Sequence, residues 1–237
     1  MAQLYAGTSG FAYPQWKPGF YPEKLPQKRF LEHYARRLNA VEINYTFRHM
    51  PATATLESWA AATPHGFRFA LKAHQSITHF RKLKDVAEPT GFFLGRLEPL
   101  RAAARLGPVL FQLPPYLRCD LALLRDFLEL LPGDIRAAFE FRHESWLTEP
   151  VYQLLQERNV SLCVAESDQL VIPEVITADL VYFRLRKQDY TPEEVSATRV
   201  RALELVAGGR DVFVFYKHED TPGGALNAEK LLETPAG

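Results

Sequence analysis

Eight short apolar segments alternate with amphipathic stretches along this 237-residue chain. This alternation limits the possible folds more than any other feature of the sequence. Polar, proline or glycine residues bound each apolar segment, as is typical of β-strands. The predicted strands are residues 3–8, 40–44, 67–72, 108–113, 136–141, 160–166, 180–185 and 211–217.

Helix signals lie between most of the strands. Asp120 is a candidate N-cap for a run of leucines at helical spacing. Thr191 and Glu194 form a capping-box pattern, with proline at the first helical position. Residues 167–179 show no helical period and are predicted to be loop. Helices are predicted over residues 119–133, 148–159, 191–209 and 227–233.

Strands that alternate with helices predict a parallel sheet. Eight such units in roughly 250 residues favour a closed (β/α)8 TIM-like barrel. We therefore expect one barrel domain over residues 1–237. An open doubly wound sheet is the alternative, but it usually carries a glycine-rich phosphate loop after its first strand. Residues 7–22 instead read GTSGFAYPQWKPGFYP, with no GxGxxG motif.

Polar and ionisable residues gather at the predicted C-terminal ends of the strands, which form the mouth of a barrel and carry its chemistry. Because side chains alternate along a strand, Glu42 shares a face with Asn44, and Glu140 shares one with Arg142. Helix-facing positions are apolar, so we expect the polar set to point inward or toward the mouth. The set consists of Thr8, Ser9, Glu42, Asn44, Lys72, Gln112, Glu140, Arg142, Glu166, Arg184, Lys217 and His218.

Two interpretations of these charges remain open. Buried charge is costly unless it is paired, so the set can form an ion-pair layer that plugs the barrel and binds nothing. It can also hold a ligand. Its excess of bases favours an anion such as phosphate or carboxylate, because guanidinium binds oxyanions bidentately. The acids are Glu42, Glu140 and Glu166, and the bases are Lys72, Arg142, Arg184 and Lys217.

His143 is the candidate for proton transfer, since the unperturbed pKa of histidine lies near neutrality. Its alternative role is a hydrogen bond to the loop backbone. Trp146 is predicted to be a packing residue.

Two segments can cover the mouth. Residues 10–22 carry five aromatic side chains, which either form a lid that stacks on a sugar or base, or pack the loop onto the barrel. Residues 73–85 are basic, and they either recruit phosphate or form a solvated charge run.

Composition excludes several classes of protein. The 28 Lys and Arg residues balance the 28 Asp and Glu residues, which disfavours a general polyanion binder. Cys119 and Cys163 show neither CxxC nor zinc-type spacing, as expected for thiols in a reducing compartment. The N-terminus lacks a signal-peptide pattern, and no apolar run approaches the ~18 residues of a membrane helix. We expect a cytoplasmic protein with no membrane partner.

No motif specifies a nucleotide, flavin or zinc cofactor, and no pattern defines an oligomeric state. Oxygen and nitrogen ligands for a divalent metal are available, but interleaved basic residues compete with a cation, which disfavours a metal site. The available ligands are Glu42, Glu140, Glu166 and His143.

Five motifs, which begin at residues 6, 41, 66, 107 and 139, resemble the YecE-like family, also called domain of unknown function 72. They read AGTSGFAYPQWKPGFYP, VEINYTF, GFRFALKAHQSITH, GPVLFQLPP and FEFRHESW. The resemblance covers essentially the whole chain. It implies a (β/α)8-like barrel but no reaction, because the family has no established activity. It places Glu42, Asn44, Lys72, Gln112, Glu140, Arg142 and His143 in signature motifs.

The chain departs from the commoner family pattern at four places, which suggests a variant branch with extra cationic groups. Glu166 stands where the family has Asp. The pairs Arg48–His49, Arg186–Lys187 and Lys217–His218 stand where the family has Tyr-Arg, His-Gly and Asn-Asn.

We expect the barrel to bind a small anionic metabolite, phosphorylated or carboxylated and sugar-like. Glu140 and His143 would move protons in a hydrolase- or isomerase-type reaction, while Glu42 orients the ligand or the bases. Nucleic-acid binding or processing through the lid and the basic segment is one alternative, and a non-catalytic metabolite sensor or scaffold is another. The predicted ligand-binding residues are Arg142, Arg184, Lys72, Asn44, Gln112, Thr8, Ser9 and Lys217.

Overall fold

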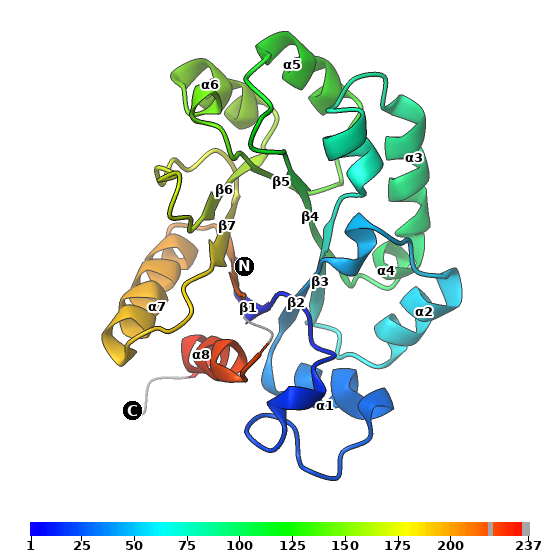
Figure 1. Ribbon diagram of the computed structural model, residues 1–237, viewed down its shortest axis with the longest axis vertical. Coiled ribbons are helices and arrows are strands. Elements are labelled where there is room, and N and C mark those ends of the chain that lie inside the picture. The colour runs from blue at the N-terminus through cyan, green and yellow to red at the C-terminus, as the bar shows by residue number, and fades with distance from the viewer. Residues whose placement is uncertain (218–219, 234–237) are drawn as a thin grey trace.

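The computed structural model describes residues 1–217 and 220–233 and shows eight parallel strands ringed by helices (Figure 1). Every predicted strand overlaps an observed one, and the expected TIM-like barrel is confirmed. The sheet order is β1-β8-β7-β6-β5-β4-β3-β2. The strands are β1 (Leu4–Thr8), β2 (Ala40–Ile43), β3 (Arg68–Lys72), β4 (Leu106–Gln112), β5 (Ala137–Glu140), β6 (Ser161–Ala165), β7 (Leu180–Leu185) and β8 (Asp211–Tyr216).

Local sequence signals mark the starts of two helices where they were predicted, after Asp120 and after Thr191. The Asp120 carboxylate accepts a hydrogen bond from the Leu123 backbone N–H at 3.0 Å. Thr191 and Glu194 form the complete capping box at the start of α7. The helices are α1 (Phe30–Arg37), α2 (Thr53–Ala61), α3 (Ala87–Arg96), α4 (Glu98–Ala102), α5 (Leu121–Glu129), α6 (Glu149–Glu157), α7 (Pro192–Ala207) and α8 (Gly223–Leu232).

The connection from β6 to β7, residues 166–179, contains no helix, as its sequence predicted. Thr177 anchors this segment from within: its hydroxyl donates to the Val160 carbonyl at 2.6 Å and accepts from the Leu162 N–H at 2.8 Å. The segment therefore takes the place of a helix on this side of the barrel and runs from the mouth, after β6, to the start of β7.

Side chains close the seam between β1 and β2. The two strands lie at opposite ends of the sheet order and are joined by an isolated bridge between Ser9 and Glu42. Elsewhere along the seam, the Asn39 amide donates to the Leu4 carbonyl and accepts from the Ala6 N–H, both at 2.8 Å. These bonds satisfy backbone groups that have no ladder partner across the seam.

The hydroxyl of Tyr34 on α1 reinforces the seam. It donates to the Ala40 carbonyl at 3.0 Å and accepts from the Thr8 N–H at 2.8 Å. The backbone is so close here that a Cβ at Gly7 would lie 1.9 Å from the Ala40 carbonyl oxygen. Glycine at this position is therefore required by the close approach of the two strands.

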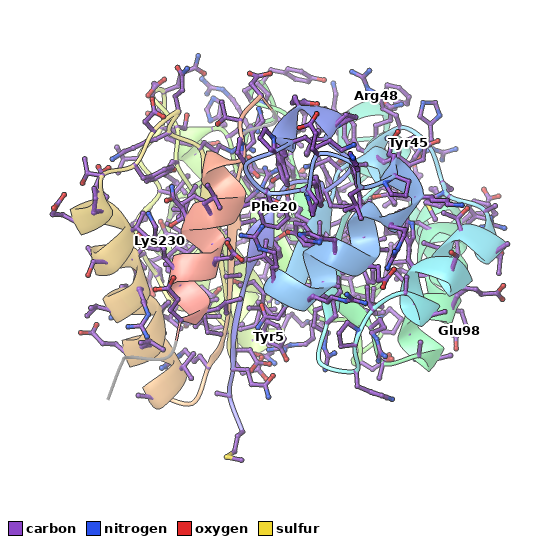
Figure 2. All side chains as sticks on the ribbon, turned by 90° about the horizontal axis from the view of Figure 1, so that it is seen from below. Tyr5, Phe20, Tyr45, Arg48, Glu98 and Lys230 are labelled. Carbon is purple, nitrogen blue, oxygen red and sulfur yellow. The ribbon has the colours of Figure 1, made fainter. Side chains whose placement is uncertain are left out.

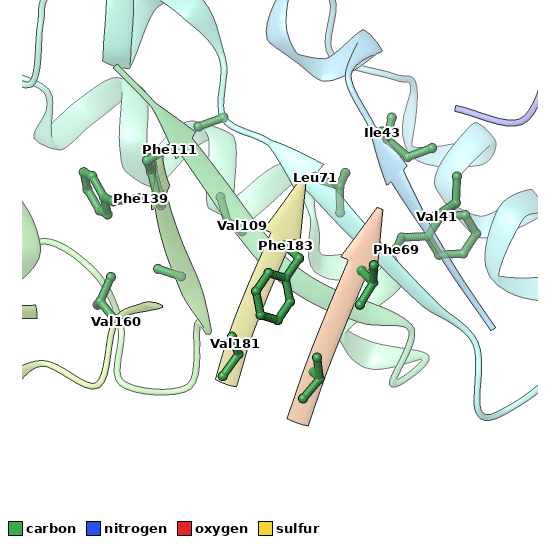
Figure 3. Close-up of a cluster of buried hydrophobic side chains, with 14 of the residues drawn as sticks. Val41, Ile43, Phe69, Leu71, Val109, Phe111, Phe139, Val160, Val181 and Phe183 are labelled. Carbon is green, nitrogen blue, oxygen red and sulfur yellow. The ribbon is translucent and has the colours of Figure 1, made fainter. Parts of the chain in front are cut away.

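Apolar side chains pack on both faces of the barrel wall. Outward-facing residues such as Val41, Phe69 and Phe183 form one layer with the helices (Figure 3). Inward-facing residues form a second layer, the inner cluster, which plugs the barrel. The inner cluster consists of Tyr5, Ala40, Ala70, Leu110, Ala138, Cys163, Ala165, Leu180, Tyr182, Phe213 and Phe215.

The aromatic segment at residues 10–22 packs inward. Trp16, Phe20 and Tyr21 are buried, and the Tyr21 ring stacks on Phe30 of α1 at 4.0 Å between centroids. Of the two alternatives for this segment, packing onto the barrel therefore holds for these three rings. In the part of the chain that the structure describes, no helix is long and apolar enough to cross a membrane.

Candidate functional site

Charged side chains lie above the inner cluster, at the mouth end of the barrel. Glu42, Glu140 and Arg184 each stand two positions beyond an inward-facing member of that cluster, so all three point inward. Figure 2 shows the two ends of the barrel: Tyr45 and Arg48, which follow β2, lie at one end, and Tyr5 lies toward the other.

Arg184 binds both carboxylates at once. Its Nε donates to Glu42 Oε2 at 2.9 Å, one terminal nitrogen donates to Glu42 Oε1 at 2.7 Å, and the other pairs with Glu140 Oε2. The exposed fractions of the three residues are 0 % for Glu42, 2 % for Glu140 and 3 % for Arg184. The mouth therefore rests on a buried ion triad that spans β2, β5 and β7.

The remaining lone pairs of Glu42 are also occupied. Ser9 Oγ donates to it at 2.7 Å, Tyr182 Oη at 2.8 Å and Asn44 Nδ2 at 3.0 Å. Burial alone would raise the pKa of Glu42, but the Arg184 charge and these hydrogen bonds outweigh burial and lower it. Glu42 is therefore a fixed anion.

Glu140 is held in the same way. Arg142 Nε donates to its Oε1 at 2.7 Å, and an Arg186 guanidinium nitrogen lies 3.4 Å from the same oxygen. Burial raises its pKa, but the charges of Arg184, Arg186 and Arg142 prevail and lower it to about 2. Arg142 also donates to Gln112 Oε1 at 3.1 Å, so Glu140 and Gln112 orient its guanidinium.

Lys72, at the end of β3, differs from the other cations. Burial lowers its pKa to about 8, the Arg184 charge adds to this effect, and the nearby carboxylates oppose it. Its Nζ lies 4.2 Å from the centroid of the Phe47 ring.

A pocket of about 680 Å³ opens beside the triad. Glu140, Arg142 and Arg186 form part of its wall, and Lys217 also contributes to it. With the adjoining Glu42, Arg184 and Lys72, the site carries six basic and four acidic side chains. The further lining residues are Pro115, Phe141, Ala165, Glu166, Ser167, Asp168, Gln169, Leu170, Ile172, Lys187 and Gln188.

Glu166 braces one wall of this pocket. Its Oε2 accepts the backbone N–H of Arg186 at 2.5 Å and that of Lys187 at 3.2 Å, and it also accepts the Tyr190 hydroxyl. The carboxylate is therefore engaged by the turn after β7, which presents Arg186 to the pocket.

Most of the predicted site residues meet here. Ser9 and Asn44 donate hydrogen bonds to Glu42 of the triad, and Gln112 accepts one from Arg142. Thr8 faces the other side of β1, where its hydroxyl lies 2.9 Å from that of Tyr34. Of the pair Lys217–His218, which departs from the family pattern, Lys217 lines the pocket and His218 lies outside the described residues.

His143 lies in the turn that follows β5. Its Nδ1 accepts the Ser145 backbone N–H at 3.1 Å and caps the short helix Glu144–Trp146. This is the backbone hydrogen bond considered as the alternative, and it engages Nδ1 rather than Nε2. A role for His143 in proton transfer stays a prediction. Trp146 is buried and stacks on Phe141 at 4.8 Å, in line with the predicted packing role.

Sequence reasoning left two residues out of the site. Tyr182 donates to Glu42, and its place two positions before Arg184 on β7 is a signal that could have found it. Arg186 appeared only as a departure from the family pattern, because it lies beyond the last strand residue, where alternation no longer predicts direction.

An exposed aromatic rim follows β2, β3 and β4. It consists of Tyr45, Phe80 and Tyr116, which are 60 %, 69 % and 63 % exposed. Lys82 Nζ lies 5.1 Å from the centroid of the Tyr116 ring, and so links two neighbouring loops of the rim. Within residues 1–217 and 220–233, no group of three or more His, Cys, Asp or Glu side chains could hold a metal ion.

Comparison with known proteins agrees with this architecture. Residues 5–236 match the model of a family described as protein of unknown function DUF72. The chain is 25 % identical over 268 positions to the UPF0759 protein YunF of Bacillus subtilis, and the match covers 97 % of the chain and 94 % of YunF.

Two further similarities concern a second curated relative and a solved structure. The chain is 29 % identical over 171 positions to the UPF0759 protein YecE of Escherichia coli, across 69 % of the chain and 59 % of YecE. The crystal structure of a DUF72 family protein from Thermotoga maritima superposes with a TM-score of 0.85 at 28 % identity, and covers 97 % of this chain and 98 % of that one. The chain therefore belongs to the DUF72 family of TIM-barrel proteins.

Proposed function

We propose that the protein binds a small anionic metabolite, phosphorylated or carboxylated and sugar-like, in the pocket at the barrel mouth. The observation that carries this proposal is the excess of basic over acidic side chains around an open pocket of about 680 Å³. If these side chains only formed a dry ion-pair plug, the acidic and basic groups would be equal in number and no pocket would open beside them. An anion would neutralise the excess, and the pocket has room for it.

Arg142 and Arg186 are the residues that would hold the anion. Both line the pocket, with side chains 34 % and 22 % exposed, and both contact Glu140. A guanidinium fixed by a buried carboxylate loses little conformational entropy when it binds an oxyanion. Ser167, Gln169 and Gln188 would contact hydroxyl groups of the ligand.

The chemistry proposed for the site is acid–base catalysis of hydrolase or isomerase type. A pKa of about 2 keeps Glu140 ionised near neutrality, so its contribution is that of an anion that orients the arginines rather than of a general acid. His143 is then the proposed proton carrier, through Nε2. If the site carries no reaction, the same contacts would serve a metabolite sensor.

A ligand screen tests the binding step. Glucose 6-phosphate, glucuronate, inorganic phosphate and uncharged glucose would be compared by thermal shift and calorimetry. We expect an anionic sugar, but not glucose, to raise the melting temperature, because a ligand at 100 times its Kd adds about 2.7 kcal/mol. Product analysis of the mixtures then separates an enzyme from a sensor.

Two matched variants locate the binding. Arg142→Gln should remove most of the shift, whereas Arg125→Gln, at an exposed ion pair with Glu157, should retain it. An equal response to glucose and to its phosphate, or an unchanged response in Arg142→Gln, would contradict the proposal.

The aromatic rim supports a second candidate, the binding of single-stranded nucleic acid. Exposed rings provide stacking platforms, and the neighbouring lysines and arginines would contact phosphates. Fluorescence anisotropy with a labelled oligonucleotide should show affinity that falls steeply with salt and is reduced in Phe80→Ala. Affinity that is independent of salt, or equal in Phe80→Ala, would exclude this candidate.

A further inference from the structure

We propose that Lys72 is a nucleophilic amine that condenses with the carbonyl group of an anionic aldehyde or ketone at the barrel mouth. The inference rests on the proposed function for the anionic part of the ligand and adds a reactive group to it. It begins from the position of Lys72 at the end of β3, near the triad but outside its hydrogen bonds.

The two nearest carboxylates are already saturated. Glu42 accepts from Arg184, Ser9, Tyr182 and Asn44. Glu140 accepts from Arg184, Arg142 and Arg186. Neither carboxylate pairs with Lys72, and across residues 1–217 and 220–233 its Nζ makes no hydrogen bond or ion pair. Its ammonium form therefore lacks the partner that a half-buried charge needs.

The surroundings of Nζ oppose a second positive charge. Arg184 of β7 and Arg142, after β5, both act on it electrostatically, and Glu140 and Glu42 offset them in part. His79 lies near enough for the Lys72 charge to lower its pKa. The Phe47 ring, 4.2 Å from Nζ, favours the ammonium form through a cation–π contact.

The result is a lysine with a substantial neutral, reactive fraction near neutral pH. Burial, the largest cause, and the neighbouring arginines lower its pKa to about 8. At pH 7.5 its neutral fraction is then roughly 200-fold larger than that of an ordinary lysine with a pKa near 10.4. A lysine that is desolvated and lies next to other cations is the arrangement that activates an amine for imine formation.

The reaction is balanced by the amine and the carbonyl compound alone. The Nζ lone pair attacks the carbonyl carbon, and the carbonyl oxygen takes one amine hydrogen to give a carbinolamine. Loss of water, which carries away that oxygen and both amine hydrogens, leaves the imine. Arg142 and Arg186 would bind the anionic group of the same molecule, since both line the pocket and the charge of Arg142 is close enough to lower the pKa of Lys72.

Reductive labelling with two aldehydes tests the inference. The protein is treated at pH 7.5 with propionaldehyde, which is neutral, or glyoxylate, which is anionic, in the presence of cyanoborohydride. Peptide mapping then gives the labelling rate of each lysine, with Lys84 of the exposed loop as the internal control. We expect propionaldehyde to label Lys72 at least tenfold faster than Lys84, with a rate that levels off above about pH 8. Lys72→Met should abolish the fast labelling.

The two aldehydes separate this inference from the proposed function. If propionaldehyde labels Lys72 no faster than Lys84, or if the rate still rises toward pH 10, the nucleophilic amine is excluded, whatever the anion data show. If propionaldehyde favours Lys72 but glyoxylate favours it no further, the amine stands and the anion site fails. A larger preference for Lys72 with glyoxylate supports both.

Discussion

Arg184 is the residue on which the interior of the mouth depends. It is the common partner of Glu42 and Glu140, and all three side chains are withdrawn from water. A buried ion pair often adds little net stability, but removal of one partner leaves an uncompensated charge in a medium of low polarity. Loss of Arg184 would leave two buried carboxylates, Glu42 and Glu140, without their shared cation.

Replacement of Arg184 by methionine should therefore lower the free energy of unfolding by about 3–5 kcal/mol. Urea denaturation at pH 7 measures the change. Arg125→Met is the matched control, because its ion pair with Glu157 is exposed, and it should change stability by no more than about 0.5 kcal/mol. Equal losses in the two variants would show that the triad is not the source of the effect.

The depressed pKa of Glu140 predicts acid sensitivity. Its folded pKa of about 2 lies below the usual 4.5, so ionised Glu140 stabilises the fold above pH 4.5. That contribution, on the order of 3 kcal/mol, should be lost as the pH falls from about 4.5 toward 2. Urea denaturation between pH 6 and pH 3 should show a shallower decline in Glu140→Gln than in the natural protein. Parallel declines would contradict the assignment.

Alternation along strands predicted which residues of this site share a face, but not which residues meet. Parity predicted that Glu42 shares a face with Asn44, just after β2, and that Glu140 shares one with Arg142, just after β5, and each pair is hydrogen-bonded. The contact of Arg184 with both acids arises only when β2 and β7 face each other across a closed barrel. Such a contact depends on curvature, which no short segment of sequence encodes.

The stability of the seam between β1 and β2 should be especially sensitive to single substitutions. Asn39 satisfies two backbone groups across it, and Asn39→Ala would leave both without a partner. We expect a loss of about 2–3 kcal/mol, measured by urea denaturation. Gln153→Ala, which removes one exposed amide contact on α6, should be close to neutral. A similar change in both variants would mean that water replaces the seam bonds.

The strands and the starts of two helices were predictable from local signals, whereas the packing of residues 10–22 was not. The capping pattern at Thr191 and the leucine spacing after Asp120 are local signals, and both helices begin where those signals lie. The rings of residues 10–22 gave no such guidance, because the same aromatics suit a lid or a packed loop. The rings form a packed loop because they contact the apolar face of α1.

The molecule as a whole should unfold in one step. β1 pairs with β8, so the strand near the start of the chain completes its ladder only with the last strand. Arg37 on α1 also pairs with Glu229 on α8, which ties together the helices nearest the two ends of the chain. No half of the barrel therefore has a complete sheet of its own.

Cooperative unfolding can be checked with two spectroscopic signals. Far-ultraviolet and near-ultraviolet circular dichroism should give coincident urea transitions, and Asn39→Ala should shift both by the same amount. Separate midpoints for the two signals would indicate that one part of the barrel melts independently. Such a result would also show that the seam is weaker than its hydrogen bonds suggest.

Glu42 connects parts of the barrel in two ways. Its backbone bridges to Ser9 where the wall would otherwise be open, and its side chain anchors Arg184 inside. A substitution of Glu42 would keep the backbone bridge but would remove both the side-chain hydrogen bond from Ser9 across the seam and the anchor of Arg184. New functions in such a protein would therefore have to evolve in the loops that follow the strands, while Glu42 is retained.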